Sequence, residues 1–253
     1  MELRKNLIFA LLLFLFMPCL AVFSLDQDLV EGDKLYEQGK FLESITVYEK
    51  ALEARPGDYE ALWRLSRSYD MQANREKKKS VKRKVLKKAV DYAEQAVSAN
   101  KNGFEGHLYL AQSLGKSSSV VSSEEKVKNT HKIRDASKKA IELKPSHYKA
   151  YMLLGMWHRK VEAATWLEKN LAQMFFGGLP EASLEEAEKS LKKSIELKDD
   201  NLEAHYELAL VFKKLKRKDE AAKELEKALR CTVRNKRQEE IKKKAAKLLK
   251  KIK

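Results

Sequence analysis

Residues 25–58 read LDQDLVEGDKLYEQGKFLESITVYEKALEARPGD, and they predict a pair of antiparallel helices. Gly32 and Ala51 are small residues at places where two helices approach closely, and the bulky Leu35 props the far side of the pair. A similar segment begins at Tyr59, an interval of 34 residues from Leu25. A helical hairpin that recurs at a regular interval in the sequence indicates a repeat architecture, in which stacked units share one continuous core.

The pattern continues over most of the chain. Five helix-like segments have a small residue at their eighth position, namely Gly32, Ser66, Ala111, Gly155 and Ala209. A second helix with small residues of its own follows each segment, and the first of these also carries Tyr48 and Pro56. The interval of 34 residues is that of tetratricopeptide repeats, which the chain resembles over residues 25–233. The resemblance implies an all-α, tetratricopeptide-like α-solenoid of about five helix hairpins.

The composition favours the same fold class. The 253 residues include only 9 Gly and 4 Pro, too few for the many turns of a β-sandwich or barrel. The final segment, residues 234–253, has Ile241, Ala245 and Leu248 at helical spacing. We expect this segment to form a basic C-terminal capping helix over the last repeat.

The fourth repeat carries a more specific pattern. It contains AYMLLGMW at residues 150–157, WLEK at residues 166–169 and FGGLPEASLEEA at residues 176–187. This pattern resembles the regulator of microtubule dynamics family, whose repeat domain has a similar Gly-x-Trp helix and a similar link before the next helix. The resemblance implies microtubule association, and for at least one member lipid binding as a tether at organelle contacts.

An insertion in this repeat brings several large aromatic side chains. Ser183 and Glu186 have the spacing of a capping box, which predicts that a new helix begins there. We expect the aromatic side chains of this repeat to pack into the core, with a lid over a ligand as the alternative: Trp157, Trp166, Phe175 and Phe176.

Positive charge is concentrated in two stretches. The net charge is +15, and residues 75–88 carry nine basic residues and one Glu, while residues 234–253 carry ten basic residues and two Glu. Such segments favour an anionic surface of a membrane or another partner, with a solvated helix face as the alternative. Nucleic acid is a weaker prediction, because no aromatic residues alternate with the basic ones. The residues expected to form the basic surface are Lys82, Arg83, Lys84, Lys243 and Lys247.

The first residues have the composition of a targeting segment. Arg4 and Lys5 precede the apolar run Leu7–Leu20, and small residues follow near Ala21. This arrangement predicts a secretory signal over residues 1–21 and export to a periplasm or cell envelope, with an uncleaved membrane anchor as the alternative. Only Cys231 would remain in the mature chain, which leaves no intramolecular disulfide.

Catalytic and metal-binding patterns are weak in this sequence. The five histidines include no pair at the i, i+4 spacing, and no cysteine pair has the spacing of a zinc site. Gly115, Lys116 and Ser117 resemble the end of a phosphate-binding loop, but the first glycine of that motif would fall on Leu110. We therefore expect a protein that is not an enzyme and that has no cofactor or metal.

A groove along the first helices of the repeats is the predicted binding site. In tetratricopeptide proteins these helices line the concave face, and their fifth and ninth residues point inward. Large, mostly apolar residues at these places favour an acyl chain or an amphipathic helix as the ligand, although a tightly curled solenoid would make the same stripe core. The residues expected to line the groove are Leu29, Trp63, Arg67, Leu108, Met152, Met156, Tyr206 and Leu210.

These observations together predict a non-catalytic binding scaffold. Its groove would take a lipid acyl chain or an amphipathic helix, and its basic segments would contact anionic surfaces. A protein–protein adaptor of an envelope complex and a microtubule-associated regulator, as the family resemblance implies, are the alternatives. The ligand, the partner and the oligomeric state stay open.

Overall fold

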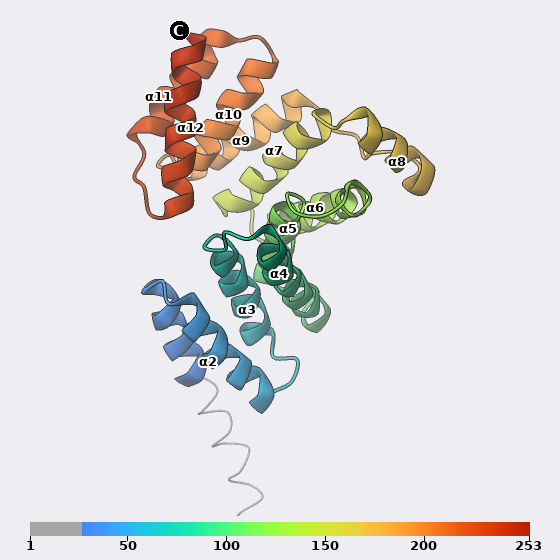
Figure 1. Ribbon diagram of the computed structural model, residues 1–253, viewed down its shortest axis with the longest axis vertical. Helices are drawn as coiled ribbons and strands as arrows, with labels where there is room; N and C mark the ends of the chain where they lie inside the picture. Colours follow the sequence, from blue (N-terminus) through green and yellow to red (C-terminus); the bar gives the residue numbers. More distant parts are fainter. Residues whose placement is uncertain (1–26) are drawn as a thin grey trace, which may run out of the picture. The chain divides into compact units, whose positions relative to one another are not determined.

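A computed structural model of the chain describes residues 27–253, and helices are the only regular structure in that range (Figure 1). The secretory signal predicted over residues 1–21 lies outside the described residues. Among the helices described, none is both long and apolar enough to span a bilayer. The chain divides into two compact units, which meet in the sequence between Lys101 and Asn102.

The first unit consists of two helical hairpins. Helical residues 27–37 pair with α2, and α3 pairs with α4. Leu29, Ile45 and Tyr48 lie in one buried cluster with Leu65 and Tyr69 of the next hairpin, so the two hairpins share a core. The bounds are α2 (Phe41–Ala54), α3 (Tyr59–Ala73) and α4 (Lys79–Ala99).

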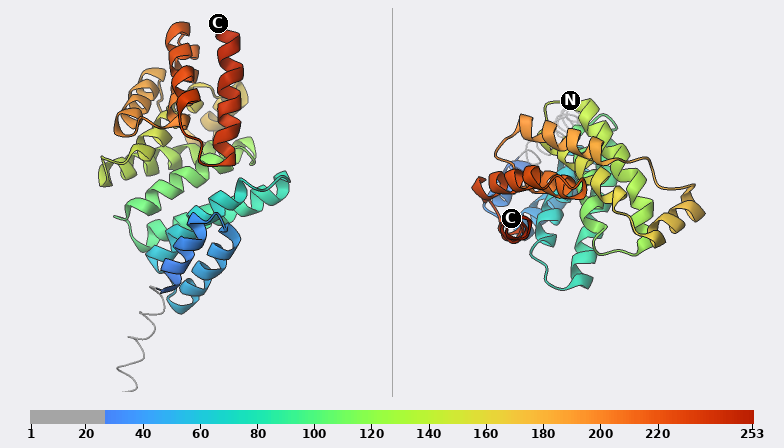
Figure 2. Two further views of the ribbon diagram at one scale, coloured as in Figure 1. Left: turned by 90° about the vertical axis from the view of Figure 1, so that its left-hand side faces the viewer. Right: turned by 90° about the horizontal axis from the view of Figure 1, so that it is seen from above.

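The second unit contains three hairpins, one inserted helix and a terminal helix. α5 pairs with α6, α7 with α9 and α10 with α11, while α8 packs against α6. α12 packs on α10 and α11, and it lies beside α11 in the views of Figures 1 and 2. The bounds are α5 (Phe104–Ser117), α6 (Ser123–Leu143), α7 (Tyr148–Glu162), α8 (Trp166–Phe176), α9 (Leu184–Leu197), α10 (Leu202–Lys214), α11 (Lys218–Arg230) and α12 (Lys236–Ile252).

The small residues of the repeat are required by close helix contacts. A Cβ atom added to Gly32 would lie 2.2 Å from the Tyr48 ring, and one added to Gly155 would lie 2.7 Å from Cγ of Leu191. The equivalent residues Ser66, Ala111 and Ala209 are fully buried. The predicted all-α class and its tetratricopeptide-like hairpins are therefore confirmed.

The expectation that the aromatic residues of the fourth repeat are core is wrong for three of the four. Trp157 is buried, and its Nε1 donates to the carbonyl oxygen of Thr130 at 2.8 Å. Trp166, Phe175 and Phe176 belong to α8 and are 79%, 56% and 38% exposed. The physical reason is that α8 has support on one side only, where Ala172 is fully buried against α6.

Candidate functional site

The N-terminal end of α4 carries several lysine and arginine side chains, although a helix dipole disfavours cations at this end. Lys78 caps this end without a side-chain hydrogen bond, and the first turn contains no acidic residue. Lys79, Arg83 and Lys84 are exposed, and Lys82 is half-buried. Within the described residues, neither Lys82 nor Lys84 forms an ion pair with a carboxylate. The helix dipole places partial positive charge at this end, so the cations are repelled.

The lysines of α12 are different because the fold accounts for some of them. Ala245 is fully buried in a cluster with Ala209, Leu225 and Ala228, so the apolar side of α12 covers the last hairpin. Lys243, Lys244 and Lys247 are exposed on the outside. Lys250 and Lys251 lie in the last turn, where the helix dipole favours cations. Of the two helices that carry the predicted basic surfaces, α12 has a side-chain cap from Asn235 and an acidic residue, Glu239, in its first turn, whereas α4 has neither.

The inward residues of the first unit are buried or bound to one another. Leu29 and Trp63 belong to the buried core. Asp33 accepts hydrogen bonds from Tyr48 Oη at 2.7 Å and Arg67 Nη2 at 2.5 Å. The guanidinium of Arg67 also lies 3.8 Å from the centroid of the Tyr36 ring. Arg67 is therefore held inside this network rather than presented to a ligand.

The ionisation of this network follows from its contacts. Burial opposes ionisation of Asp33, but hydrogen bonds from Tyr48 and Arg64 and the charges of Arg64 and Arg67 outweigh it and lower the pKa of the carboxyl group. Burial and the hydrogen bond to Asp33 raise the pKa of Tyr48. The cluster is thus a carboxylate held by two arginines and a neutral phenol, which stabilises the first two hairpins.

The inward residues of the second unit show the same tendency. Leu108 and Met152 are buried. Met156 packs against the core cluster of α7, α9 and α10, and Tyr206 packs against the cluster that α10, α11 and α12 share. Leu210 is half-buried. An inner groove for an acyl chain stays a prediction, since these side chains are engaged within their own unit.

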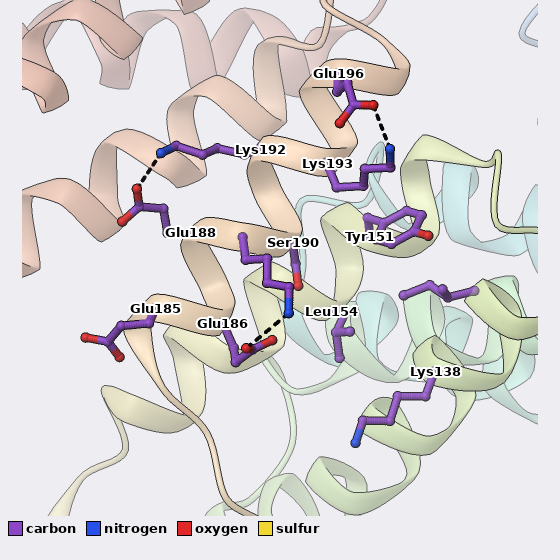
Figure 3. A pocket seen from close by; sticks show the side chains of 12 residues that line it. Lys138, Tyr151, Leu154, Glu185, Glu186, Glu188, Ser190, Lys192, Lys193 and Glu196 are labelled. Atoms are coloured by element: carbon purple, nitrogen blue, oxygen red, sulfur yellow. Dashed lines mark hydrogen bonds and ion pairs between the residues drawn. The ribbon is translucent and has the colours of Figure 1, made fainter.

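A hollow of about 860 Å³ lies between α6 and α9, which are second helices of neighbouring hairpins. Its apolar floor is formed by Ile141, Tyr151 and Leu154. Figure 3 shows Tyr151 and Leu154 of α7 between the charged side chains of α9 and Lys138 of α6. None of the eight residues predicted for the groove lines this hollow.

The rim of the hollow carries acidic and basic side chains, and most of them form ion pairs with one another. Lys192 donates to Glu188 and Lys193 to Glu196, each at 2.6 Å, while Lys189 lies 3.5 Å from Glu186. The remaining rim charges are Lys138 and Glu185, and neither forms an ion pair within the described part of the chain. Sequence reasoning missed this hollow. The only signal for it was the long insertion between the two helices of the fourth repeat.

Helix α8 presents an apolar face on a firm base. Thr165 and Glu168 form a capping box at its N-terminus, and Gly177 ends it in the left-handed conformation at φ 70°. Glu168, which is buried, forms an ion pair with Lys126 of α6. These contacts hold the helix in place, so Trp166 is exposed by the fold and not by fraying.

The described residues offer little for catalysis. No group of three or more His, Cys, Asp or Glu among them is placed to hold a metal ion. Cys231 is buried, and burial raises the pKa of its thiol, which lowers its reactivity. Both ring nitrogens of His205 face oxygen atoms, Nδ1 at 2.5 Å from Glu224 and Nε2 at 2.9 Å from the carbonyl of Asp199, so its role is structural.

Comparison with known proteins identifies relatives over almost the whole described chain. The family model "Regulator of microtubule dynamics protein 1-3" matches residues 28–253. Regulator of microtubule dynamics protein 1 of Bos taurus is 29% identical over 66% of this chain, and that of Mus musculus is 28% identical over 90%. The matches span 52% of the bovine protein and 75% of the mouse protein, so this chain corresponds to about half of the former.

Solved structures show the same fold at low sequence identity. A thermophilic tetratricopeptide repeat protein of Thermus thermophilus is similar with a TM-score of 0.63 and 20% identity, over 88% of this chain and 99% of that one. The protein YrrB, described as a tetratricopeptide repeat protein with an unusual peptide-binding site, gives a TM-score of 0.51 at 16% identity, over 87% and 90% of the two chains. These similarities show a tetratricopeptide-like α-solenoid.

The comparisons correct one prediction and confirm another. Export to a periplasm or cell envelope is wrong, because the curated relatives are animal proteins named as regulators of microtubule dynamics, and animal cells have no periplasm. The resemblance that the motifs of the fourth repeat indicated is confirmed by the family match. This chain belongs to the family of regulator of microtubule dynamics proteins 1-3.

Proposed function

We propose that this chain is a microtubule-associated scaffold whose contact surface is the basic N-terminal end of α4. Two observations support the proposal. The relatives of the chain are named regulators of microtubule dynamics, and the tetratricopeptide-like fold fits a non-catalytic role in binding protein partners. The α4 surface then specifies where an acidic partner is bound.

The position of the charge in α4 is the observation that carries the proposal. Cations near the N-terminus of a helix lose on the order of 0.3–1 kcal/mol each through the dipole at low ionic strength. Lys79 and Lys82 are the first and fourth residues of α4, where they oppose the dipole, and the chain places no carboxylate in the first turn to offset them. Charge that weakens its own helix is best explained by a partner that neutralises it.

Co-sedimentation of the purified full chain with polymerised microtubules tests this proposal. The triple variant Lys82→Glu, Arg83→Glu, Lys84→Glu is compared with Lys243→Glu, Lys244→Glu, Lys247→Glu, which makes the same charge change on α12. We expect the α4 variant to bind at least about tenfold more weakly, or about 1.4 kcal/mol. The α12 variant should lose about threefold or less, and wild-type binding should weaken with added salt.

Two results would contradict the proposal. Wild-type chain that stays in the supernatant at every protein concentration would exclude microtubules as the partner. Equal losses in the two variants would show that net charge, not the α4 surface, sets the affinity. Vesicles with and without phosphatidylserine, tested with the same two variants, show whether a lipid surface competes for α4. The acyl-chain groove has no comparable support, since its predicted residues are largely buried or half-buried.

A further inference from the structure

Most of the large apolar side chains that the described part of the chain exposes lie on one short helix. They are Trp166, Leu167, Met174, Phe175 and Phe176, all in α8. At 100° per residue, Trp166 and Met174 fall on the side opposite the buried Ala172, with exposed fractions of 79% and 73%. Leu167 lies on the same outer side, whereas Phe175 and Phe176 fall nearer to Ala172, and Phe176 contacts His131 of α6. An exposed apolar face such as that of Trp166, Leu167 and Met174 indicates an interaction site.

Contacts within the chain fix the position of α8, so its exposed apolar face does not depend on a partner for its conformation. The capping box at Thr165, the buried ion pair between Glu168 and Lys126, and the left-handed Gly177 fix both ends of α8. A fixed apolar surface loses little conformational entropy on binding, so its burial, at roughly 25 cal/mol per Å², stabilises a complex efficiently.

A complementary surface lies on the same side of α6. Lys126, which holds α8, is followed at helical spacing by Thr130, Arg134, Lys138 and Ile141. At 100° per residue these five residues lie within an arc of about 120° on α6. Lys138 and Ile141 line the hollow between α6 and α9, about 18 and 22 Å along the axis from Lys126 at 1.5 Å per residue. The contact with α8 and the lining of the hollow therefore lie on the same side of α6.

We propose that two copies of this chain associate about a two-fold axis, with α8 of each copy seated in the hollow between α6 and α9 of the other. A two-fold interface requires one patch that is complementary to itself. The patch contains both parts that such an interface needs, an exposed apolar helix and a hollow with Tyr151 and Leu154 in its lining, so each copy can offer both to the other.

Charge and area favour a second copy as the occupant. Of the two charged residues of α8, Glu168 is buried and Lys169 is exposed without an ion pair in the described chain. Glu185 on the rim of the hollow is also exposed and unpaired there, so the two are complementary. Aromatic side chains bury roughly 150–250 Å² each. Two copies of α8 and the surfaces that face them reach on the order of 1,200 Å², the lower range of stable interfaces.

The molar mass of the full chain in solution, measured by light scattering or sedimentation across micromolar concentrations, tests this inference. We expect a dimer of the wild-type chain and a monomer of the Trp166→Glu, Met174→Glu variant. The matched control is Val30→Glu, Leu42→Glu, which changes two exposed apolar residues of the first unit and should stay dimeric. Circular dichroism confirms that each variant is folded.

A charge exchange tests the register of the interface. Lys169→Glu and Glu185→Lys should each weaken the dimer by about threefold or more, and the double variant should regain most of the loss, as coupled pairs do.

A monomeric wild-type chain at all concentrations would overturn the proposal, as would a dimer that survives Trp166→Glu, Met174→Glu. Monomers that float with phosphatidylcholine vesicles only when Trp166 and Met174 are intact would assign the face to lipid instead. Each result is independent of microtubule binding by α4.

Discussion

At the scale of single residues, the small positions of the repeat decide how closely two helices pack. A Cβ atom on Gly155 would meet Cγ of Leu191 at 2.7 Å and the carbonyl oxygen of Ala187 at 3.1 Å. The backbone oxygen cannot move without shifting α9, so the contact requires the helices to separate. Gly155 is for this reason a fixed position of the fold, whereas Gly115 has nothing within 4 Å of its would-be Cβ atom.

Gly155→Ala and Gly115→Ala are therefore expected to have opposite effects on stability. The first should lower the free energy of unfolding by about 1–3 kcal/mol through overpacking. The second should raise it by up to about 1 kcal/mol, because alanine has the higher helix propensity. Urea denaturation of the two variants beside wild type measures both, and a loss of equal size at Gly115 would refute the packing argument.

His147 gives the fold a sensitivity to mild acid. Its burial, together with the charges of Lys149, Lys144 and Lys198, lowers its pKa from 6.5 to about 4. The ring packs on Phe104 with centroids 4.7 Å apart. A base whose pKa is lower in the folded state stabilises fully only above its unfolded value, and that stability is lost as pH falls from about 6.5 toward 4.

His147→Gln should remove this part of the pH dependence. Wild-type chain is expected to lose about 1–2 kcal/mol more than the variant between pH 7 and pH 4.5, after allowance for solvent screening. Urea titrations at both pH values provide the comparison. Identical pH profiles for the two proteins would show that His147 does not titrate in this range on folding.

At the scale of helices, the sequence identified the basic residues of α4 by composition, but it predicted the wrong location for the aromatic side chains of α8. The basic run of α4 was identified from composition, but only the observed first residue, Lys79, showed that the charge opposes the helix dipole. In α8 the large aromatic residues were expected to be core. The size and apolarity of a side chain favour burial, but they do not report whether another element covers it. For Trp166 none of the described elements does.

Charge reversal at Lys79 should therefore strengthen the fold while it weakens binding. Glutamate in the first turn of α4 complements the dipole, so Lys79→Glu is expected to raise the free energy of unfolding by about 0.3–1 kcal/mol. Lys243→Glu near the middle of α12 serves as the control and should change it by less than about 0.5 kcal/mol. Thermal and urea denaturation at low salt measure the difference; destabilisation by Lys79→Glu would contradict the dipole argument.

At the scale of the whole molecule, the repeat made most of the architecture predictable. Five hairpins and their small contact positions follow from one spacing rule, since each position recurs in the same place. The inserted helix α8 lies outside this spacing, so the repeat does not predict its position. The hollow beside Tyr151 is lined by residues of α6, α7 and α9, so it depends on how three helices pack, which a single chain's residue pattern does not encode. The interior position of Met152 and Leu108 likewise depends on neighbours from other helices.

The terminal helix offers a test at this scale. Removing residues 236–253 would expose the buried cluster that includes Ala209, Leu225 and Ala228. We expect the truncated chain to unfold at lower urea, by about 2 kcal/mol or more, and to bind a hydrophobic dye, because end repeats need a cover. Full-length chain with Lys243, Lys244 and Lys247 changed to Gln should keep wild-type stability. A truncated chain as stable as wild type would show that α12 does not act as a cap.

The pairing of helices has a final consequence for how this chain acquires its structure. Every helix contacts partners no more than three elements away in the labelled order, with α7 and α10 the most distant pair. Apart from that pair, the helices in contact are neighbours or next neighbours in the chain, so little entropy is lost in bringing them together, and low contact order is associated with fast folding. We therefore expect each hairpin to form during synthesis, before the C-terminus is made.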